Sequence, residues 1–286
     1  MSMVGELSCF LGLQIKQRSE GIFISQEKYA RNIVKKFELE QSRHKRTLTA
    51  THVKITKDTN DTTVDHKLYR SMIKSLLYLT ATRPDIVYVV GICARFQSNP
   101  RVSQLAAVKK IIKYVHETSA FGILYSYDRD SILVGFCDTD WVDFSNDRKS
   151  TSGGCFFLGN NIISWLSKKR NCVSLSTAEV EYIAEGSACT QLIWMKNMLH
   201  EYGITQDIMT LYCDNLSAID ISKNPIQHGR TKHIDIRHHF IRGLIEDKII
   251  TLEDVHSNFQ LTDIFTKPLD ASTFEHLRAE LGVCKI

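Results

Sequence analysis

Four acidic residues between positions 138 and 263 have the type and placement that metal-dependent chemistry needs. Asp138 and Asp214 each follow a short apolar run, so each is expected where a strand ends. Glu181 lies in the first turns of a long predicted helix, and Asp263 precedes a further apolar helical segment. Carboxylates at the ends of adjacent strands can converge in one crevice, where open α/β sheets usually bind ligands.

Carboxylates from separate elements are the hard oxygen ligands that Mg²⁺ prefers. Two such ions a few ångströms apart activate the attacking water and stabilise the leaving oxygen in phosphodiester cleavage. The alternative is structural, because Asp and Glu near helix starts commonly act as caps and as partners of the helix dipole. For any one of these residues alone, capping outweighs catalysis by about three to one, so the spacing leaves both interpretations open.

The elements that must position these acids follow from hydrophobic periodicity, helix caps and prolines. Before residue 120 the pattern predicts a hairpin over 9–24, a linker over 41–63, and helices over 26–37, 69–82, 85–97 and 103–117. After it, the pattern predicts strands at 121–127, 133–137, 154–158, 162–165, 209–213 and 249–252, a long helix that starts at Ser176, and a helix over 235–246. Strands paired by short turns and then alternating with helices predict an α/β fold with a mixed sheet. We therefore expect a mainly helical unit over 1–118 and a second domain over 119–286.

The composition is that of an ordinary globular protein, with 43% hydrophobic and 24% charged residues. The formal net charge of +4 is compatible with an anionic partner. The eight cysteines contain no C-x-x-C pair, which argues against a zinc knuckle or a dense disulfide framework. No signal peptide and no membrane-length apolar run is present, so we expect an intracellular protein, in a cytoplasmic particle or the nucleus, that is not secreted and has no membrane partner.

Several long strings resemble, in order, the ribonuclease H domain of copia-type retroelements. They are Cys137-Asp-Thr-Asp-Trp141, Asp147-Arg-Lys-Ser-Thr-Ser-Gly153, Leu175-Ser-Thr-Ala-Glu-Val-Glu-Tyr182, Tyr212-Cys-Asp-Asn215 and Asp263-Ile-Phe-Thr-Lys-Pro-Leu269. Upstream, Gly5-Glu-Leu-Ser-Cys-Phe-Leu-Gly-Leu-Gln14 and Ser75-Leu-Leu-Tyr-Leu-Thr-Ala-Thr-Arg-Pro-Asp85 resemble the tail of the same elements' reverse transcriptase. The resemblance covers nearly the whole chain.

This resemblance implies a ribonuclease H-like mixed five-stranded sheet with flanking helices, preceded by a reverse transcriptase remnant. It assigns the metal-binding and catalytic carboxylates to Asp138, Glu181, Asp214 and Asp263, with two Mg²⁺ ions as cofactors and Mn²⁺ as a substitute. Asp138 is preferred to Asp140 because it directly follows the strand and aligns with the family's strand-end aspartate. His256 resembles the mobile histidine that assists product release in some ribonucleases H. The paired aspartates of a polymerase palm do not occur, so no polymerase activity is expected.

Basic residues near the proposed site are candidates for phosphate binding. They are Arg148, Lys149, Lys168, Lys169, Arg170, Arg230, Lys232 and Arg237. A run of charged residues is usually just a solvated loop. For this chain we give phosphate binding and a solvated loop about equal weight. The histidines near 228–239 lack the cysteine partners or the H-E-x-x-H spacing of familiar zinc sites, for which we estimate roughly one chance in ten.

We predict an enzyme that hydrolyses the RNA strand of RNA–DNA hybrids with Mg²⁺, with the hybrid and the rest of the reverse transcriptase as partners. The 2′-hydroxyl is what distinguishes RNA from DNA at such a site. The alternative is a catalytically inert retrotransposon remnant, at most a nucleic-acid-binding module. Retention of all four acids favours the enzyme, whereas Lys74 and Leu166, which depart from the family pattern, favour the remnant.

Overall fold

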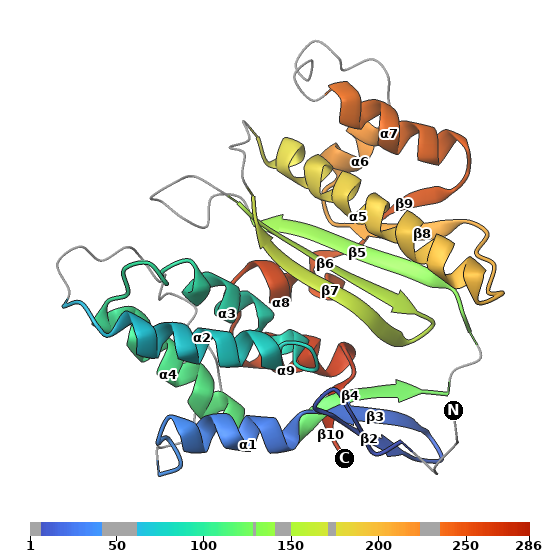
Figure 1. Cartoon of the computed structure of the whole chain (residues 1–286). Helices are drawn as coiled ribbons and strands as arrows, with labels where there is room; N and C mark the ends of the chain where they lie inside the picture. Colours follow the sequence, from blue (N-terminus) through green and yellow to red (C-terminus); the bar gives the residue numbers. More distant parts are fainter. Residues whose placement is uncertain (1–6, 42–61, 128–129, 141–149, 171–175, 224–234) are drawn as a thin grey trace. The chain divides into compact units, whose positions relative to one another are not determined.

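The computed structural model describes residues 7–41, 62–127, 130–140, 150–170, 176–223 and 235–286, without the side chains of 235–239. The chain forms two compact units, one of Met1–Tyr127 with Pro268–Ile286 and the other of Asp128–Lys267 (Figure 1). The linker expected over 41–63 lies almost wholly outside the described residues. Within the described part, no helix combines the length and apolarity needed to cross a membrane.

The first unit combines helices with a five-stranded antiparallel sheet of order β1-β2-β3-β4-β10. Its strands are β1 (Cys9–Phe10), β2 (Leu13–Gln17), β3 (Gly21–Ser25), β4 (Phe121–Ser126) and β10 (Val283–Lys285). Its helices are α1 (Glu27–Lys36), α2 (His66–Leu79), the 3₁₀ turn η1 (Pro84–Ile86), α3 (Val87–Ala94), α4 (Val102–Glu117) and α9 (Ala271–Glu280). The predicted hairpin and the predicted helices of this region are present.

A buried ion pair fixes the centre of the first unit. Arg83 is 1% exposed, and its Nε and Nη2 donate to Asp85 at 2.8 and 2.7 Å. The Arg83 Nη1 also donates to the Thr118 carbonyl (2.9 Å), and the Tyr114 hydroxyl donates to Asp85 (2.7 Å). Because buried charges need both a partner and full hydrogen bonding, this network ties η1 to the end of α4.

The division into compact units differs from the boundary expected between residues 118 and 119. The strand β4 pairs with β3, placing Ile123 opposite Ile24, and therefore belongs to the first unit. The chain end also returns there, since β10 pairs with β4 and the Phe274 ring of α9 meets Tyr114 edge-on at 5.8 Å. β4 belongs to the first unit because its apolar residues pair with the N-terminal strand β3. A local sequence pattern cannot predict which distant strand is the pairing partner.

The second unit confirms the predicted mixed five-stranded α/β sheet, with order β7-β6-β5-β8-β9. Its strands are β5 (Leu133–Asp140), β6 (Thr151–Leu158), β7 (Asn161–Lys169), β8 (Met209–Cys213) and β9 (Ile250–Asp254). Its helices are α5 (Thr177–Glu201), α6 (Leu216–Lys223), α7 (Asp235–Glu246), the 3₁₀ turn η4 (Ser257–Phe259) and α8 (Asp263–Thr266). The pairs β5–β6 and β6–β7 are antiparallel, whereas β5–β8 and β8–β9 are parallel.

The long helix α5 packs along β5, with α6 and α7 beside it (Figure 1). The helix begins where predicted, because the Ser176 Oγ accepts from the Glu179 backbone N–H at 3.2 Å. It ends before Gly203, whose φ of +75° suits the left-handed residue that follows many helices. Buried side chains of α5 such as Leu192 and Met195 share one core with Leu211 of β8. This core fixes the ends of β5 and β8 at the same edge of the sheet.

Candidate metal centre

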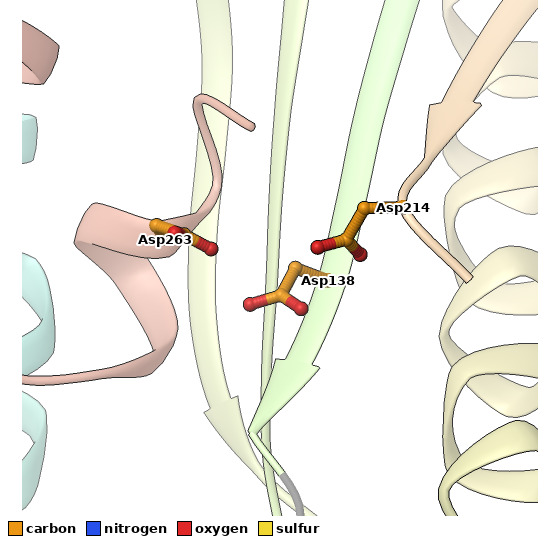
Figure 2. Close-up of side chains that lie close together, drawn as sticks. All are labelled: Asp138, Asp214 and Asp263. Atoms are coloured by element: carbon orange, nitrogen blue, oxygen red, sulfur yellow. The ribbon is translucent and has the colours of Figure 1, made fainter. Parts of the chain in front are cut away.

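Three aspartates from three separate elements meet at that edge of the second unit. Asp138 lies near the end of β5, Asp214 directly follows β8, and Asp263 is the first residue of α8 (Figure 2). One carboxylate oxygen from each lies within 4.8 Å of the others. The parallel pairing of β5 and β8 explains the first two positions, since Phe136 pairs with Tyr212 and both strands then end in the same direction. Three of the four predicted acids therefore come together.

The third aspartate depends on how closely α8 approaches the sheet. The residue beneath α8 is Gly153 of β6, where an added Cβ would lie 2.7 Å from the Thr266 methyl and 2.9 Å from the Phe265 Cβ. The Ser167 hydroxyl of β7 also donates to the Phe265 carbonyl at 2.6 Å. The Thr266 hydroxyl donates to Asp138 Oδ2, so α8 is joined to β5 by a side chain as well. Absence of a side chain at Gly153 thus allows Asp263 to reach the cluster.

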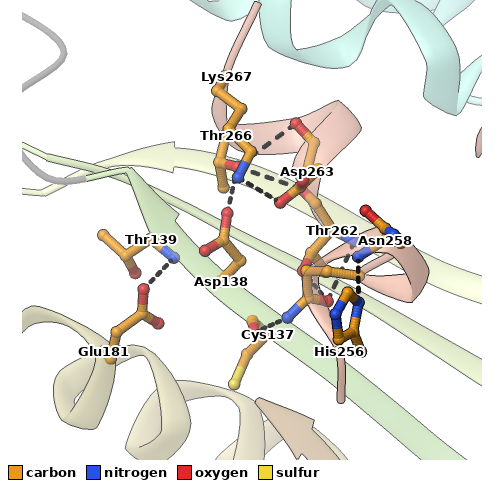
Figure 3. Close-up of polar contacts among 11 residues, drawn as sticks. Cys137, Asp138, Thr139, Glu181, His256, Asn258, Thr262, Asp263, Thr266 and Lys267 are labelled. Carbon is orange, nitrogen blue, oxygen red and sulfur yellow. Dashed lines mark hydrogen bonds and ion pairs between the residues drawn. The ribbon is translucent and has the colours of Figure 1, made fainter. Parts of the chain in front are cut away.

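Glu181 lies beside the end of β5, outside the group of three (Figure 3). Its Oε1 accepts from the Thr139 backbone N–H at 3.1 Å, and it is 5% exposed. Among the described residues no group hydrogen-bonds its buried Oε2. Burial, and then the charges of Asp138 and Asp214, raise the pKa of Glu181 well above its usual range. A buried carboxylate oxygen without a partner is suited to a cation that completes its coordination.

The pKa values of Asp214 and Asp263 are also raised. Burial, and then Asp138, raise the pKa of Asp214. Burial raises the pKa of Asp263 to about 7, with Asp138 and Asp214 adding to the rise, while Lys267 acts in the opposite direction. The Lys267 Nζ lies 2.8 Å from Asp263 Oδ1 and is the cation that partly offsets this charge. Clustered carboxylates with hard oxygen donors are the ligand set of Mg²⁺, so the residues fit a divalent cation.

The capping interpretation fails for each acid that precedes or begins a helix. Ser176, and not Glu181, caps α5. For α6 the capping oxygen is Asn215 Oδ1, which accepts from the Ala218 N–H at 3.2 Å. At α8 the Asp263 side chain forms an ion pair with Lys267 instead of accepting from the helix N-terminus. Among the described residues, none of the four acids therefore forms a capping hydrogen bond to a helix N-terminus.

One contributor was missed by the sequence interpretation. Gln260 is fully buried, and its Nε2 donates to the carbonyl of Cys137, the residue before Asp138, at 3.0 Å. Its Oε1 accepts from the Thr262 hydroxyl at 2.6 Å. A polar residue three positions before Asp263 was a weak signal, because nothing in the sequence indicates that its side chain is buried.

Of the other predicted site residues, those whose side chains the structure describes do not join the cluster of acids. His256 is exposed, its Nδ1 accepts from the Asn258 N–H at 3.2 Å, and its ring meets Phe259 edge-on at 6.4 Å. Lys168 is exposed and Lys169 half-buried. The guanidinium of Arg170 is held by Ser152 (2.6 Å) and by Ser187 (3.1 Å). Outside the described residues or side chains lie Arg148, Lys149, Arg230, Lys232 and Arg237. The roles of all these residues stay predictions.

Comparison with known proteins gives consistent relatives by sequence. The chain is 36% identical over 292 residues to the retrovirus-related Pol polyprotein from transposon TNT 1-94 of Nicotiana tabacum, matching 99% of this chain and 22% of that protein. It is 32% identical over 282 residues to the Pol polyprotein from transposon RE1 of Arabidopsis thaliana, matching 98% and 19%. The chain therefore spans about a fifth of the length of these curated relatives. No family model matches it.

Similar solved structures include an N-terminal ribonuclease H domain from Mycobacterium tuberculosis, which is 8% identical with a TM-score of 0.36. The match covers 98% of that structure and 52% of this chain. A ribonuclease H1 in complex with an RNA/DNA hybrid is 10% identical with a TM-score of 0.34, and 93% of it is covered by 47% of this chain.

Proposed function

The chain belongs to the Pol polyproteins of copia-type retrotransposons, and from that premise we propose that its second unit is a ribonuclease H that hydrolyses the RNA strand of RNA–DNA hybrids. The observation that carries the proposal is the cluster of Asp138, Asp214 and Asp263, whose oxygens lie within 4.8 Å of one another without any capping role. Glu181, with its unpartnered buried oxygen, lies beside the same strand end.

Each acid has a distinct role in this proposal. Two bound divalent cations, Mg²⁺ or Mn²⁺, would supply Lewis acidity at the scissile phosphate and lower the pKa of the attacking water. Asp138 and Asp214 would hold the ions, and Asp263 would complete the second position. Glu181 would ligate one ion and orient the ribose 2′-hydroxyl, which selects RNA. His256 assists release of the product, and the basic residues from Arg148 onward neutralise substrate phosphates.

The test is cleavage of a labelled RNA–DNA hybrid by the purified chain, with Mg²⁺ and with EDTA. We expect Mg²⁺-dependent loss of the RNA strand, and a fall of at least ~100-fold in Asp138→Asn, because removing a ligand should exceed the 10–100-fold cost typical of residues that only support ligands. Asp140→Asn is the matched control, since Asp140 ends the same strand but lies outside the cluster. Binding of the hybrid in EDTA should be similar in all three proteins.

Two results would count against the proposal. Cleavage by Asp138→Asn at the wild-type rate would remove the metal centre from the reaction. A well-folded chain that binds the hybrid and does not cleave it would favour the alternative, an inert remnant that acts as a nucleic-acid-binding module.

We also propose that the first unit binds the polymerase part of the same polyprotein, which the much greater length of the relatives supports. Leu11 and Tyr78 are 76% and 46% exposed, and the Tyr78 hydroxyl donates to the Leu11 carbonyl at 2.7 Å. Exposed apolar side chains held together are typical of interaction surfaces. We expect the chain to co-purify with a separately expressed polymerase segment, and we expect Leu11→Asp to weaken this binding. Equal capture of the polymerase segment by wild type and by Leu11→Asp would exclude this surface.

A further inference from the structure

Gln260 is a buried amide between η4 and α8 that has no assigned function. Its side chain is fully buried, although glutamine is usually exposed. An amide offers two N–H donors and an oxygen with two lone pairs, and each must find a partner when water is excluded. The partners that Gln260 finds all belong to segments that carry the aspartates.

The hydrogen bonds of Gln260 reach two of the segments that carry the aspartates. The Nε2 donates to the Cys137 carbonyl (3.0 Å), which fixes the backbone that presents Asp138. The backbone carbonyl of Gln260 accepts from the Asp263 N–H at 3.3 Å.

The acceptor side of the amide fixes the turn that leads into α8. Oε1 accepts from the Thr262 hydroxyl at 2.6 Å, and the Thr262 N–H lies 3.4 Å from the same oxygen. Glutamine suits this place because the Cys137 carbonyl that faces its nitrogen can only accept a hydrogen bond. A glutamate would present a second acceptor there and add a negative charge to the cluster.

We propose that Gln260 is a positioning residue of the metal centre, one that sets the placement of Asp138 relative to Asp263 and so determines the affinity for divalent cations. The inference rests on the proposed function of the cluster as a metal site. It assigns Gln260 no contact with the metal or the substrate. Side chains that orient metal ligands in this way typically change metal affinity 10–100-fold when removed.

The chain contains a matched control at the opposite end of β5. The Gln206 Oε1 accepts from the Leu133 N–H at 2.8 Å, and its Nε2 donates to the Ser131 carbonyl at 2.5 Å. Gln206 therefore also bridges its side chain to the backbone of β5, but at the start of the strand. Gln206→Leu should lower general stability without acting on the acids.

The test is a Mg²⁺ titration of the full chain in three forms, wild type, Gln260→Leu and Gln206→Leu. Binding is measured as the shift of the thermal unfolding midpoint with Mg²⁺ concentration. We expect a 10–100-fold weaker Mg²⁺ affinity for Gln260→Leu and a change within about 2-fold for Gln206→Leu. Equal Mg²⁺ affinity in wild type and Gln260→Leu would overturn the inference, whether or not cleavage falls. If wild type shows no Mg²⁺-induced shift, the metal site itself fails and both proposals fall with it.

Two further variants keep the test decisive if Gln260→Leu does not fold. Gln260→Glu retains the length of the side chain and its acceptor for Thr262 but loses both donors, so we expect it to weaken Mg²⁺ binding as well. Gln260→Asn retains the amide with one methylene less and should lie between wild type and Gln260→Glu. Wild-type Mg²⁺ affinity in Gln260→Glu would show that the hydrogen bond to the Cys137 carbonyl has no positioning role.

Discussion

Replacing Glu185 by glutamine should stabilise the protein at neutral and alkaline pH. Glu185 lies one helical turn after Glu181 on α5 and is fully buried. Burial raises the pKa of Glu185 to about 7, although hydrogen bonds from Ser222 and Cys213 act in the opposite direction. The Ser222 hydroxyl donates to Oε2 at 2.8 Å, an acceptor that the glutamine amide oxygen can replace. The substitution therefore removes a buried titration while keeping the main contact.

The size of the effect follows from linkage between protonation and folding. The folded-state pKa of about 7 exceeds the unfolded value of 4.5, so the folded protein binds this proton more tightly than the unfolded chain does. The stability that this provides is fully present below pH 4.5 and is lost as pH rises to about 7. At about 1.4 kcal/mol for each unit of pKa, the difference of about 2.5 corresponds to about 3 kcal/mol.

The measurement is the free energy of unfolding by urea, for wild type and Glu185→Gln, at several values between pH 4.5 and 8. The difference between the two proteins should grow by about 3 kcal/mol across this range in favour of the variant. Constant effects of the amide cancel, because only the change with pH is compared. Glu201→Gln, on an exposed residue of the same helix, should show less than ~0.5 kcal/mol of change. A difference for Glu185→Gln that stays constant with pH would refute the reasoning.

Two other substitutions test the packing around the site and in the first unit. Gly153→Ala should cost about 1–3 kcal/mol of stability and weaken Mg²⁺ binding, because the added Cβ would lie 2.7 Å from α8. The control is Gly154→Ala, whose Cβ would meet no atom closer than 3.4 Å. In the same Mg²⁺ titration this control should bind Mg²⁺ as tightly as wild type. Equal Mg²⁺ affinities would contradict the role of this close approach. Arg83→Met should destabilise the first unit by about 3–5 kcal/mol in urea unfolding, because it leaves Asp85 buried without its partner. Arg31→Met, which removes an exposed ion pair, should cost less than ~1 kcal/mol in the same assay. Similar losses from both would indicate that the buried pair contributes no more than an exposed one.

Much of the second unit could be predicted because its signals are local. The strand over 209–213 and the helix over 235–246 match β8 and α7, since apolar periodicity and caps act within a few residues. The acids Asp138 and Asp214 could be placed at one edge of the sheet because each directly follows an apolar run. The family resemblance then separated these acids from the capping interpretation, which their spacing could not do.

What could not be predicted depends on contacts between distant segments. Strand β4 pairs with β3, about a hundred residues earlier, and α9 with β10 returns to the first unit from the end of the chain. No periodicity in 121–127 distinguishes pairing with β3 from pairing with β5. The burial of Gln260 has the same origin, because its partner Cys137 lies 123 residues away. Side chains that support a site are therefore harder to find than the ligands themselves.

The electrostatics of the cluster indicate why the chain retains four acids at one edge of the sheet. The pKa values of Glu181, Asp214 and Asp263 are all raised, in each case with burial as the largest cause and Asp138 contributing. Each raised pKa is a free-energy cost at neutral pH, and Lys267 offsets only part of it. Selection for stability alone would replace such acids with amides or apolar residues. A divalent cation among the carboxylates removes this cost, so its binding energy becomes folding energy. The unfavourable charge is thus better explained by cation binding than by any contribution to the fold.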